Sequence, residues 1–372
     1  MPPMRKHLWP GLLSGVLLVS LMAGVASAAE LPKTISDKEF WRLVTDLSEK
    51  GGVFSLQFMS NEDSAQFVIP MLKESTKKGG VFIGVGSEQN FTYIAATQPR
   101  LAFVLDIRRD NMIEHLMYKV MFEISADRAD LVSRLFARRR PSGLNANSTV
   151  KALFDAYQSV PVDDVYYEEN LRTVIDHLMK DHGFPLTDTD KADVGRMMNA
   201  FRTAGPNSLK GFGDATNPTY AQLMAATDLA GNQQSYLATE ANFKIVKDLE
   251  RQNLIIPLVG DFAGDKAIAG VAQYLKEHSA IANVFYVSNV ERYLWEQGDH
   301  GKQFYANVAR LPLDASSTFV RAVTSDISVR LGIPIPESRA KWRTFLFSIN
   351  DCLQGVTSGR IQSYRDLFVG AK

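Results

Sequence analysis

The spacing of apolar residues changes twice between residues 79 and 109 and predicts a strand, a helix and a second strand. Residues 81–85 form a short apolar run rich in β-branched side chains, which is typical of a strand buried on both faces. Apolar residues then recur at helical spacing over residues 91–95, and residues 101–105 are a second apolar run. This order predicts a βαβ unit whose strands lie side by side in a parallel sheet.

The same alternation returns late in the chain. Apolar runs at residues 254–259, 281–287 and 318–324 are separated by segments with helical spacing. Pro257 cannot donate a backbone hydrogen bond, so the strand that contains it belongs at a sheet edge. The pattern predicts an α/β protein with a three-layer, Rossmann-like and mostly parallel sheet.

No strand is evident in the middle of the chain, where the periodicity predicts a helical insertion. The insertion includes a turn-rich loop at residues 205–218 that could act as a lid. The tail after residue 325 is predicted to be mostly helical, around residues 342–353 and 361–368. The predicted units are N-terminal helices that pack on the sheet (29–78), the first half of the Rossmann-like domain (79–141), the insertion (142–241), the second half (242–325) and the helical tail (326–372).

Near the N-terminus, the pattern predicts a helix at residues 36–49 and another that opens at residues 60–63. Polar residues at the start of a helix usually cap it. We therefore interpret Asn61 and Glu62 as caps, with a ligand-binding role as the alternative.

A glycine turn follows the first predicted strand. Gly84 and Gly86 permit a sharp bend and close approach of a ligand, and Asp106 follows Gly86 by about 20 residues, the spacing at which such folds place an acid on a ribose hydroxyl. Glu88 stands where a third glycine would complete the motif. Backbone N–H groups near Asn90, at the start of the next helix, could contact a ligand. The alternative is a βαβ unit that binds no nucleotide.

Two later strands also end in polar residues, namely Asp261 after one and Ser288, Asn289 and Glu291 after the next. Ligands of open α/β sheets bind at the carboxyl ends of strands. We therefore predict one cleft bordered by these residues and by the glycine turn. Taken singly, each of these residues is more often a helix cap than a catalytic group.

Charge and residue type exclude several classes of function. The formal net charge is zero, with 41 basic and 41 acidic residues, so nothing favours a nucleic-acid partner or a membrane surface. Cys352 is the single cysteine, which rules out an internal disulfide, and its apolar surroundings predict a buried packing residue. His177 and His182 are five residues apart, a poor spacing for one helical face, so no metal is expected.

The first 28 residues have the pattern of a signal peptide. Arg5 and Lys6 precede a short apolar run at residues 12–24, and residues 26–28 are small. The run is shorter than the roughly 20 residues of a membrane span, so cleavage is expected, with an uncleaved anchor as the alternative. The mature protein is then exported, to the periplasm in a cell with two membranes, and has no further membrane contact.

The order of these elements resembles class I S-adenosylmethionine-dependent methyltransferases. More narrowly, the segments GVGSEQNFTYIAATQPRLAFVLDIRRDN and VGDFAG…FYVSNVE resemble a little-characterised bacterial group of methyltransferase-like, often exported proteins. The chain departs from the family where Phe82 or Ile83 replaces an acid before the first glycine, and where Glu88 replaces the third glycine. The family's closing antiparallel hairpin is not evident in the tail.

The resemblance implies S-adenosylmethionine as cofactor and assigns roles to residues at the strand ends. The implied cofactor-binding residues are Gly84, Gly86, Glu88, Asn90, Asp106, Asp261 and Ser288, with Asn289 to position the methyl acceptor and Glu291 to take a proton.

Three hypotheses follow. The first is an exported methyltransferase of unknown acceptor. The second is a non-catalytic sensor or binding protein that kept the fold and holds another small ligand in the cleft. The third is a role in binding a protein partner through residues 142–241.

Overall fold

The computed structural model describes residue 1 and residues 30–55, 57–209, 217–331 and 340–369. The predicted signal peptide, beyond residue 1, and residues 210–216 of the predicted lid loop lie outside the described residues. The centre is a six-stranded sheet in the order β3-β2-β1-β4-β5-β6. The strands are β1 (Val81–Gly84), β2 (Leu101–Asp106), β3 (Ile255–Val259), β4 (Ala282–Ser288), β5 (Thr318–Thr324) and β6 (Trp342–Ser348).

The sheet is parallel except for its last strand. β1 pairs with β2 on one side and with β4 on the other, both in parallel, and β6 runs antiparallel to β5. The chain therefore builds outward from β1 to β3 and then returns to place β4 on the opposite side of β1. Such a reversal of strand order opens a crevice at the carboxyl ends of the two central strands. The prediction of an α/β protein with a mostly parallel sheet is confirmed, and the strand order is compatible with a Rossmann-like fold.

β3 lies at one edge of the sheet, as Pro257 predicted. Pro257 pairs in register with Val104 of β2, and β3 has no strand on its other side. The missing N–H of proline is harmless there because no neighbouring strand needs it. Helix α1 (Asp37–Leu47) packs against this edge strand and α11 (Ala267–Glu277).

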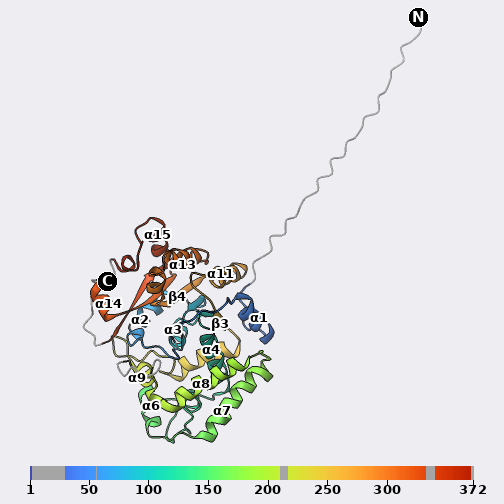
Figure 1. Cartoon of the computed structure of the whole chain (residues 1–372), viewed down its shortest axis with the longest axis vertical. Helices are drawn as coiled ribbons and strands as arrows, with labels where there is room; N and C mark the ends of the chain where they lie inside the picture. The colour runs from blue at the N-terminus through green and yellow to red at the C-terminus, as the bar shows by residue number, and fades with distance from the viewer. Residues whose placement is uncertain (2–29, 56, 210–216, 332–339, 370–372) are drawn as a thin grey trace.

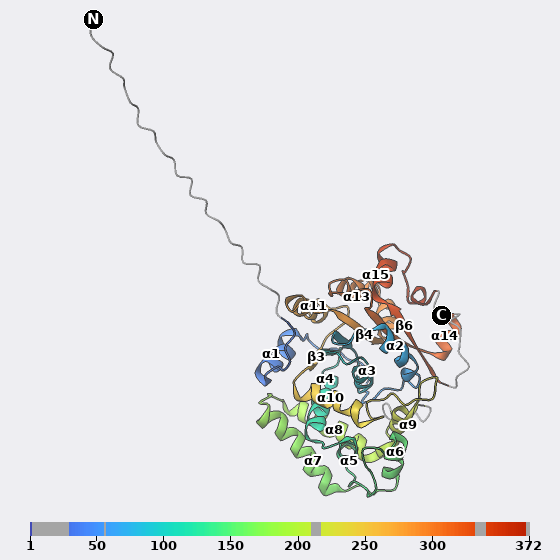
Figure 2. The same cartoon turned by 180° about the vertical axis from the view of Figure 1, so that it is seen from behind.

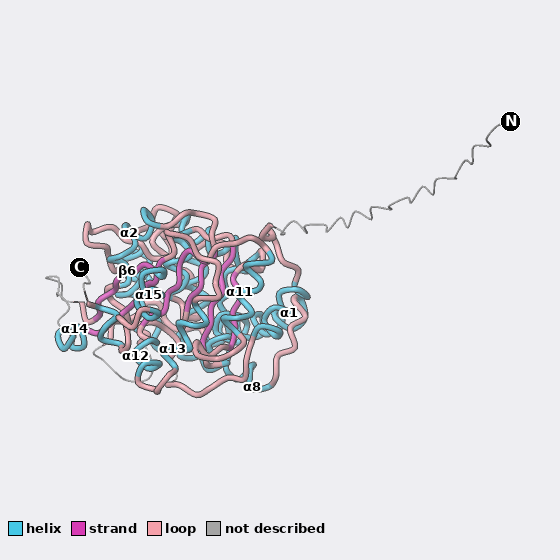
Figure 3. Tube along the Cα trace, turned by 90° about the horizontal axis from the view of Figure 1, so that it is seen from above, coloured by secondary structure: helices cyan, strands magenta, loops and turns pink. Residues whose placement is uncertain are grey.

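Helices cover both faces of the sheet (Figures 1 and 2). On one side α3 (Gln89–Thr97), α4 (Arg109–Ile124) and α10 (Glu240–Arg251) pack together, and on the other lie α11, α13 (His300–Val308) and α15 (Ile349–Thr357). Figure 3 shows the strands in the interior, with α1 and α14 near opposite ends of the sheet. The shorter elements are η1 (Ala65–Val68), α2 (Ile69–Ser75), α12 (Val290–Trp295), α14 (Ser325–Leu331) and η4 (Tyr364–Phe368).

The insertion between β2 and β3 forms a further helical layer outside α4 (Figure 1, green). Helices α4 and α8 contact each other, as do α6 and α9. Across the described part of the chain, none of the helices is both long and apolar enough to cross a bilayer. The insertion elements are α5 (Arg128–Leu135), α6 (Val150–Gln158), α7 (Asp164–Asp176), the π-helix η2 (His177–Asp181), α8 (Asp188–Ala204), η3 (Gly205–Asn207) and α9 (Tyr220–Ala225).

The prediction of a helical tail is wrong over residues 342–348, which form strand β6. Trp342 and Phe347 belong to residue types that favour strands, and β6 pairs along the whole of β5. Without β6, the backbone groups of β5 would form an open sheet edge. Residues 342–348 become a strand because they pair with β5, and the apolar spacing within the segment carries no information about that partner.

One buried side chain joins the insertion to the sheet domain. Arg128, at the start of α5, is 2% exposed. Its guanidinium donates hydrogen bonds to the carbonyls of Leu237 (2.9 Å) and Ala238 (2.8 Å) before α10 and to that of Ala146 (3.0 Å), and it pairs with Glu240. Arg128 thus satisfies carbonyls of two loops that would otherwise be buried without donors.

Replacing Arg128 should destabilise the whole chain. In Arg128→Met, these carbonyls and the Glu240 carboxylate lose their donor, and we expect the free energy of unfolding to fall by about 3–5 kcal/mol. The exposed control Arg42→Met, which breaks surface pairs with Glu39 and Asp46, should change it by less than about 1 kcal/mol. Urea unfolding followed by circular dichroism measures both, and equal losses in the two variants would contradict the assignment.

Candidate functional site

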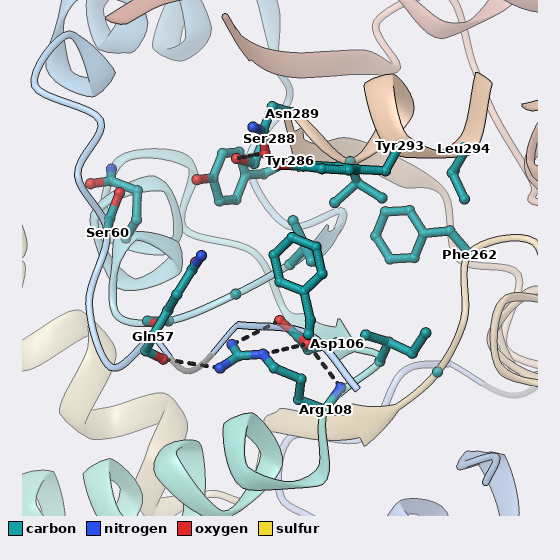
Figure 4. Close-up of a pocket in the computed structure, with 18 of the residues that line it drawn as sticks. Gln57, Ser60, Asp106, Arg108, Phe262, Tyr286, Ser288, Asn289, Tyr293 and Leu294 are labelled. Atoms are coloured by element: carbon teal, nitrogen blue, oxygen red, sulfur yellow. Dashed lines mark hydrogen bonds and ion pairs between the residues drawn. The ribbon is translucent and has the colours of Figure 1, made fainter. Parts of the chain in front are cut away.

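A cleft of about 310 Å³ opens where the carboxyl ends of four parallel strands meet (Figure 4). Gly86 and Asp106 both line it, so the glycine turn and the end of β2 share one hollow, as the sequence predicted. The strand-end residues around the cleft are Val85, Gly86 and Ser87 after β1, Asp106 and Ile107 at β2, Gly260 and Asp261 after β3, and Ser288 and Asn289 at β4.

Aromatic and apolar side chains form much of the wall. Residues 53–62, which precede η1, form one side of the cleft in the part that the structure describes. Within this segment, Phe54 meets Tyr293 of α12 edge to face, with ring centroids 5.2 Å apart. Figure 4 shows Tyr293 beside Leu294 and Phe262, across the cleft from Gln57 and Asp106. Apolar walls with a few polar groups are typical of small-molecule sites.

Asp106, the predicted ribose acid, is held by a neighbour. Arg108 donates to its two carboxylate oxygens from Nε (3.1 Å) and Nη2 (3.2 Å), and from its own backbone N–H (2.9 Å). Arg108 also donates to the carbonyl of Gln57 (3.1 Å), as the dashed lines in Figure 4 show. Both charged side chains are nearly buried, so this pair is part of the cleft floor. A ribose would have to share Asp106 with Arg108.

Gly84 and Asn90 do not line the cleft, contrary to their predicted role in cofactor binding. A Cβ on Gly84 would lie 1.9 Å from Asn90 Oδ1, so glycine is needed there to admit Asn90 and not a ligand. Asn90 Nδ2 donates to the carbonyls of Val85 (3.0 Å), Gly86 (3.1 Å) and Ser87 (2.7 Å). Asn90 therefore fixes the shape of the turn from behind.

Glu88 also lies behind the cleft and is fully buried. Its carboxylate oxygens accept hydrogen bonds from the backbone N–H of Ser60 at 3.1 and 3.0 Å. The residue that replaces the third glycine thus ties segment 53–62 to the glycine turn. Its predicted contact with a cofactor does not fit this placement.

Glu291, the predicted proton acceptor, faces away from the cleft into the protein. Its carboxylate pairs with Arg321 of β5 (Nη2 at 3.1 Å) and accepts from the Tyr305 hydroxyl, and all three side chains are buried. Cys352 is also buried, as predicted, and Arg321 Nη1 lies 3.4 Å from its Sγ. Burial raises the pKa of Tyr305 well above its usual value. Glu291 is therefore placed to stabilise the fold.

Ser288, Asn289 and Asp261 do reach the cleft. Ser288 has a φ of 50°, and its hydroxyl donates to the carboxylate of Glu62. Asp261 Oδ1 accepts from the backbone N–H of Ala263 at 2.9 Å, which leaves its other oxygen without a partner in the described contacts. The three residues come from two strand ends on opposite sides of β1 and β2.

Asn61 and Glu62 line the cleft and precede the N-cap position of η1, so the prediction that they cap this helix is wrong. The residue before η1 is Ser64, and its side chain makes no capping hydrogen bond. Burial, followed by the nearby charge of Glu62, raises the pKa of Tyr286, which also lines the cleft. The polar run at residues 60–63 was the available signal, but only the fold shows that it faces β4.

His115, which the sequence analysis did not single out, supports the glycine turn. Its Nε2 lies 2.8 Å from the carbonyl oxygen of Gly86, and Nδ1 is buried. Burial lowers the pKa of His115 to about 4. At neutral pH the ring is therefore neutral, with Nε2–H donating to Gly86.

The family model described as "Domain of unknown function (DUF7790)" matches residues 57–354. The chain belongs to this family. The matched range contains all six strands and nearly all residues that line the cleft. No curated protein matches the chain. The family description names no activity.

Within the described residues, one group of side chains has the donors and proximity to hold a metal ion: Glu123, His177 and His182. None of the three lines the cleft. The expectation of no metal rested on the five-residue spacing of the histidines, and the structure removes that argument by bringing their rings to 5.0 Å between centroids.

Removing the Glu291 side chain should affect stability more than cleft chemistry. Glu291→Ala leaves Arg321 buried without its carboxylate, and we expect a loss of about 3–5 kcal/mol in the free energy of unfolding. Glu296→Ala, on the exposed end of the same short helix, should cost less than about 1 kcal/mol. Thermal and urea unfolding measure both, and a Glu291→Ala variant as stable as wild type would restore the proton-acceptor hypothesis.

His115 should make stability fall in acid. The folded state has a His115 pKa of about 4 against an ordinary 6.5, so the unfolded chain binds the extra proton first as the pH falls. This contribution to stability is complete above pH 6.5 and is lost towards pH 4. Between pH 7 and pH 5, we expect the stability advantage of wild type over His115→Gln to shrink by about 2 kcal/mol.

Urea midpoints at the two pH values give this difference, with His300→Gln, at a half-exposed position, as the control. A His115→Gln variant whose stability follows wild type in parallel from pH 7 to pH 5 would show that His115 is not buried neutral.

Proposed function

We propose that the cleft binds a small nucleoside-containing ligand that carries positive charge, S-adenosylmethionine being the first candidate, and that the protein is a methyltransferase of unknown acceptor. The main observation in support of this proposal is that the ends of four parallel strands meet at one open cleft, which is lined by carboxylates and aromatic rings.

The strand order supports a nucleoside ligand. In parallel sheets whose strand order reverses beside the first strand, nucleoside ligands bind at the carboxyl ends of the central strands, over a glycine turn. Gly86 has a φ of 76° and open space where a Cβ would stand, so the backbone can approach a ligand closely. The antiparallel pairing of β5 with β6 also supports the resemblance to class I methyltransferases, whose closing antiparallel element the sequence did not reveal.

The charges at the cleft favour a cationic ligand over a polyphosphate. Glu62, Asp106 and Asp261 bring carboxylates to the lining, whereas Arg108 is its one guanidinium among the described residues and is paired with Asp106. A ligand with several phosphates would meet net repulsion there. The sulfonium and ammonium groups of S-adenosylmethionine would instead be attracted by carboxylates and by aromatic faces.

Methyl transfer requires few catalytic groups at this site. The acceptor attacks the methyl carbon in line, and the sulfonium leaves as a neutral thioether, so catalysis depends chiefly on orientation. In this proposal, Asn289 and Ser288 position the acceptor. Glu62, whose carboxylate contacts Ser288, takes the role in proton transfer first assigned to Glu291.

A second candidate is a non-catalytic sensor or binding protein, and the Arg108–Asp106 pair favours it. In this case, the acid that would hold a ribose is already neutralised by the protein itself. Export to the periplasm remains a prediction from the signal-peptide pattern. An exported methyltransferase would need a supply of S-adenosylmethionine outside the cytoplasm. A protein partner for residues 142–241 likewise remains a prediction.

Calorimetry of the mature chain with S-adenosylmethionine and its demethylated product tests the proposal. We expect micromolar affinity, weakened at least about tenfold in Asp261→Asn, which removes the charge but keeps the acceptor for the Ala263 N–H. Asp265→Asn, an exposed carboxylate in the same turn that does not line the cleft, is the matched control. Asp106→Ala is a poor probe, because it would leave the buried Arg108 without the carboxylate that accepts three of its hydrogen bonds.

If calorimetry detects no heat of binding at millimolar ligand while circular dichroism shows that the chain is folded, S-adenosylmethionine is excluded as the ligand. Native mass spectrometry of the exported protein then decides whether the second candidate holds, since a binding protein should carry a co-purifying small molecule.

A further inference from the structure

Three segments that are distant in the sequence converge at the far end of α4. The α4 helix begins beside the cleft at Arg109, and Glu123 lies in its last turn. Glu123 Oε2 is 2.9 Å from Nε2 of His182 and 3.3 Å from Nε2 of His177. Asp37 at the start of α1 and Asp181 of η2 complete the cluster.

The π-helical turn explains why His177 and His182 meet. The backbone N–H of His182 donates to the carbonyl of His177 at 3.0 Å, which is the i to i+5 bond of a π-helix. In an α-helix, residues five apart point in different directions, whereas this wider turn brings them to the same side. Single π turns of this kind occur frequently at functional sites.

Hydrogen bonds orient both rings in the way that metal-bound histidines are oriented. Nδ1 of His182 lies 2.7 Å from Asp37 Oδ1, and Nδ1 of His177 lies 2.6 Å from Asp181 Oδ2. A carboxylate beside Nδ1 accepts a hydrogen bond from the ring Nδ1–H, and this tautomer leaves Nε2 with a bare lone pair. Both Nε2 atoms then face the same oxygen of Glu123. Three lone-pair donors pointing at one place require a cation between them or additional protons.

We propose that Glu123, His177 and His182 bind a divalent transition metal, with zinc as the best match. The three ligand atoms lie within 4.8 Å of one another. A tetrahedral zinc with ligands at about 2.0–2.1 Å separates neighbouring ligand atoms by about 3.3 Å, close to the distances between Glu123 and the two rings. Two imidazoles with one carboxylate suit zinc better than magnesium or calcium, which prefer oxygen donors.

The surroundings suit a cation that arrives from solvent. His177, His182 and Glu123 have side chains that are 28%, 12% and 10% exposed, so the site is shallow and reachable. Lys119 Nζ donates to the other oxygen of Glu123 at 2.8 Å and so orients it. The cluster contains one ammonium group and three carboxylates, those of Glu123, Asp37 and Asp181. Its net charge is therefore negative when both imidazole rings are neutral.

The position of the site suggests that the metal is structural. Asp37 belongs to α1 beside the edge strand, Glu123 to a helix of the sheet layer, and the histidines to the insertion. A metal here joins all three parts. Because the folded chain binds it and the unfolded chain lacks the assembled site, zinc should raise the thermal midpoint as its concentration increases.

The test uses the full mature chain, freed of metal with a chelator and titrated with zinc chloride by calorimetry. We expect one zinc per chain at micromolar affinity or tighter. His177→Ala, at a half-buried position in the π turn, should weaken binding at least about 100-fold. Asp181→Asn should weaken it about 10- to 100-fold, because a neutral amide oxygen accepts from the ring N–H more weakly than the carboxylate does. His278→Ala, which removes a ring stacked on Tyr274 on α11, should bind zinc as wild type does.

Zinc-independent thermal midpoints, or equal zinc affinity in His177→Ala and His278→Ala, would overturn the proposal. So would a wild-type chain that binds no zinc, because hydrogen bonds alone would then hold the cluster together. If His177→Ala does not fold, Asp181→Asn carries the comparison, since its side chain is 65% exposed.

Discussion

The carboxyl ends of parallel strands must meet at one edge of a sheet, and the rest of this structure depends on that constraint. β1 is buried along its whole length and pairs on both sides, so the chain can only extend the sheet outward from it. The change of direction between β1 and β4 separates the helices that follow them onto opposite faces. The space left between those helices is the cleft, and most of the residues that line it come from a strand end, from α12 or from segment 53–62.

Many of the polar side chains near the cleft do not face its interior and instead fix the shape of the cleft wall. Asn90, His115 and Glu88 bind the carbonyls and N–H groups of the glycine turn and of segment 53–62. Backbone groups turned away from water need such partners, because an unmade buried hydrogen bond costs more than a made one contributes. The turn can therefore present Gly86 openly to the cleft while Asn90 and His115 hold its carbonyls from behind.

Helix α4 links the three regions of interest in this protein. Its first residue, Arg109, pairs with Asp190 of α8 at 2.8 Å, close to the cleft-lining Arg108. Its middle carries His115 against the glycine turn, and its last turn carries Glu123 against the histidines of the insertion. The insertion is thus joined to the sheet domain at both ends of one buried helix. A ligand in the cleft and a metal at the histidines would act on the same rigid element.

Apolar spacing by itself determined the α/β class and the five parallel strands, because buried strands and amphipathic helices leave periodic patterns within a few residues. The missing N–H of Pro257 determined that its strand lies at an edge. The glycine turn and Asp106 were also found at the shared cleft that their spacing predicted. Tertiary structure alone decided that Glu291 pairs inward with Arg321, that Glu62 faces Ser288, and that residues 342–348 form β6. It also decided that a π turn brings His177 onto His182. Each of these depends on a partner far away in the chain, or on a departure from regular helix geometry, and local periodicity carries no information about either.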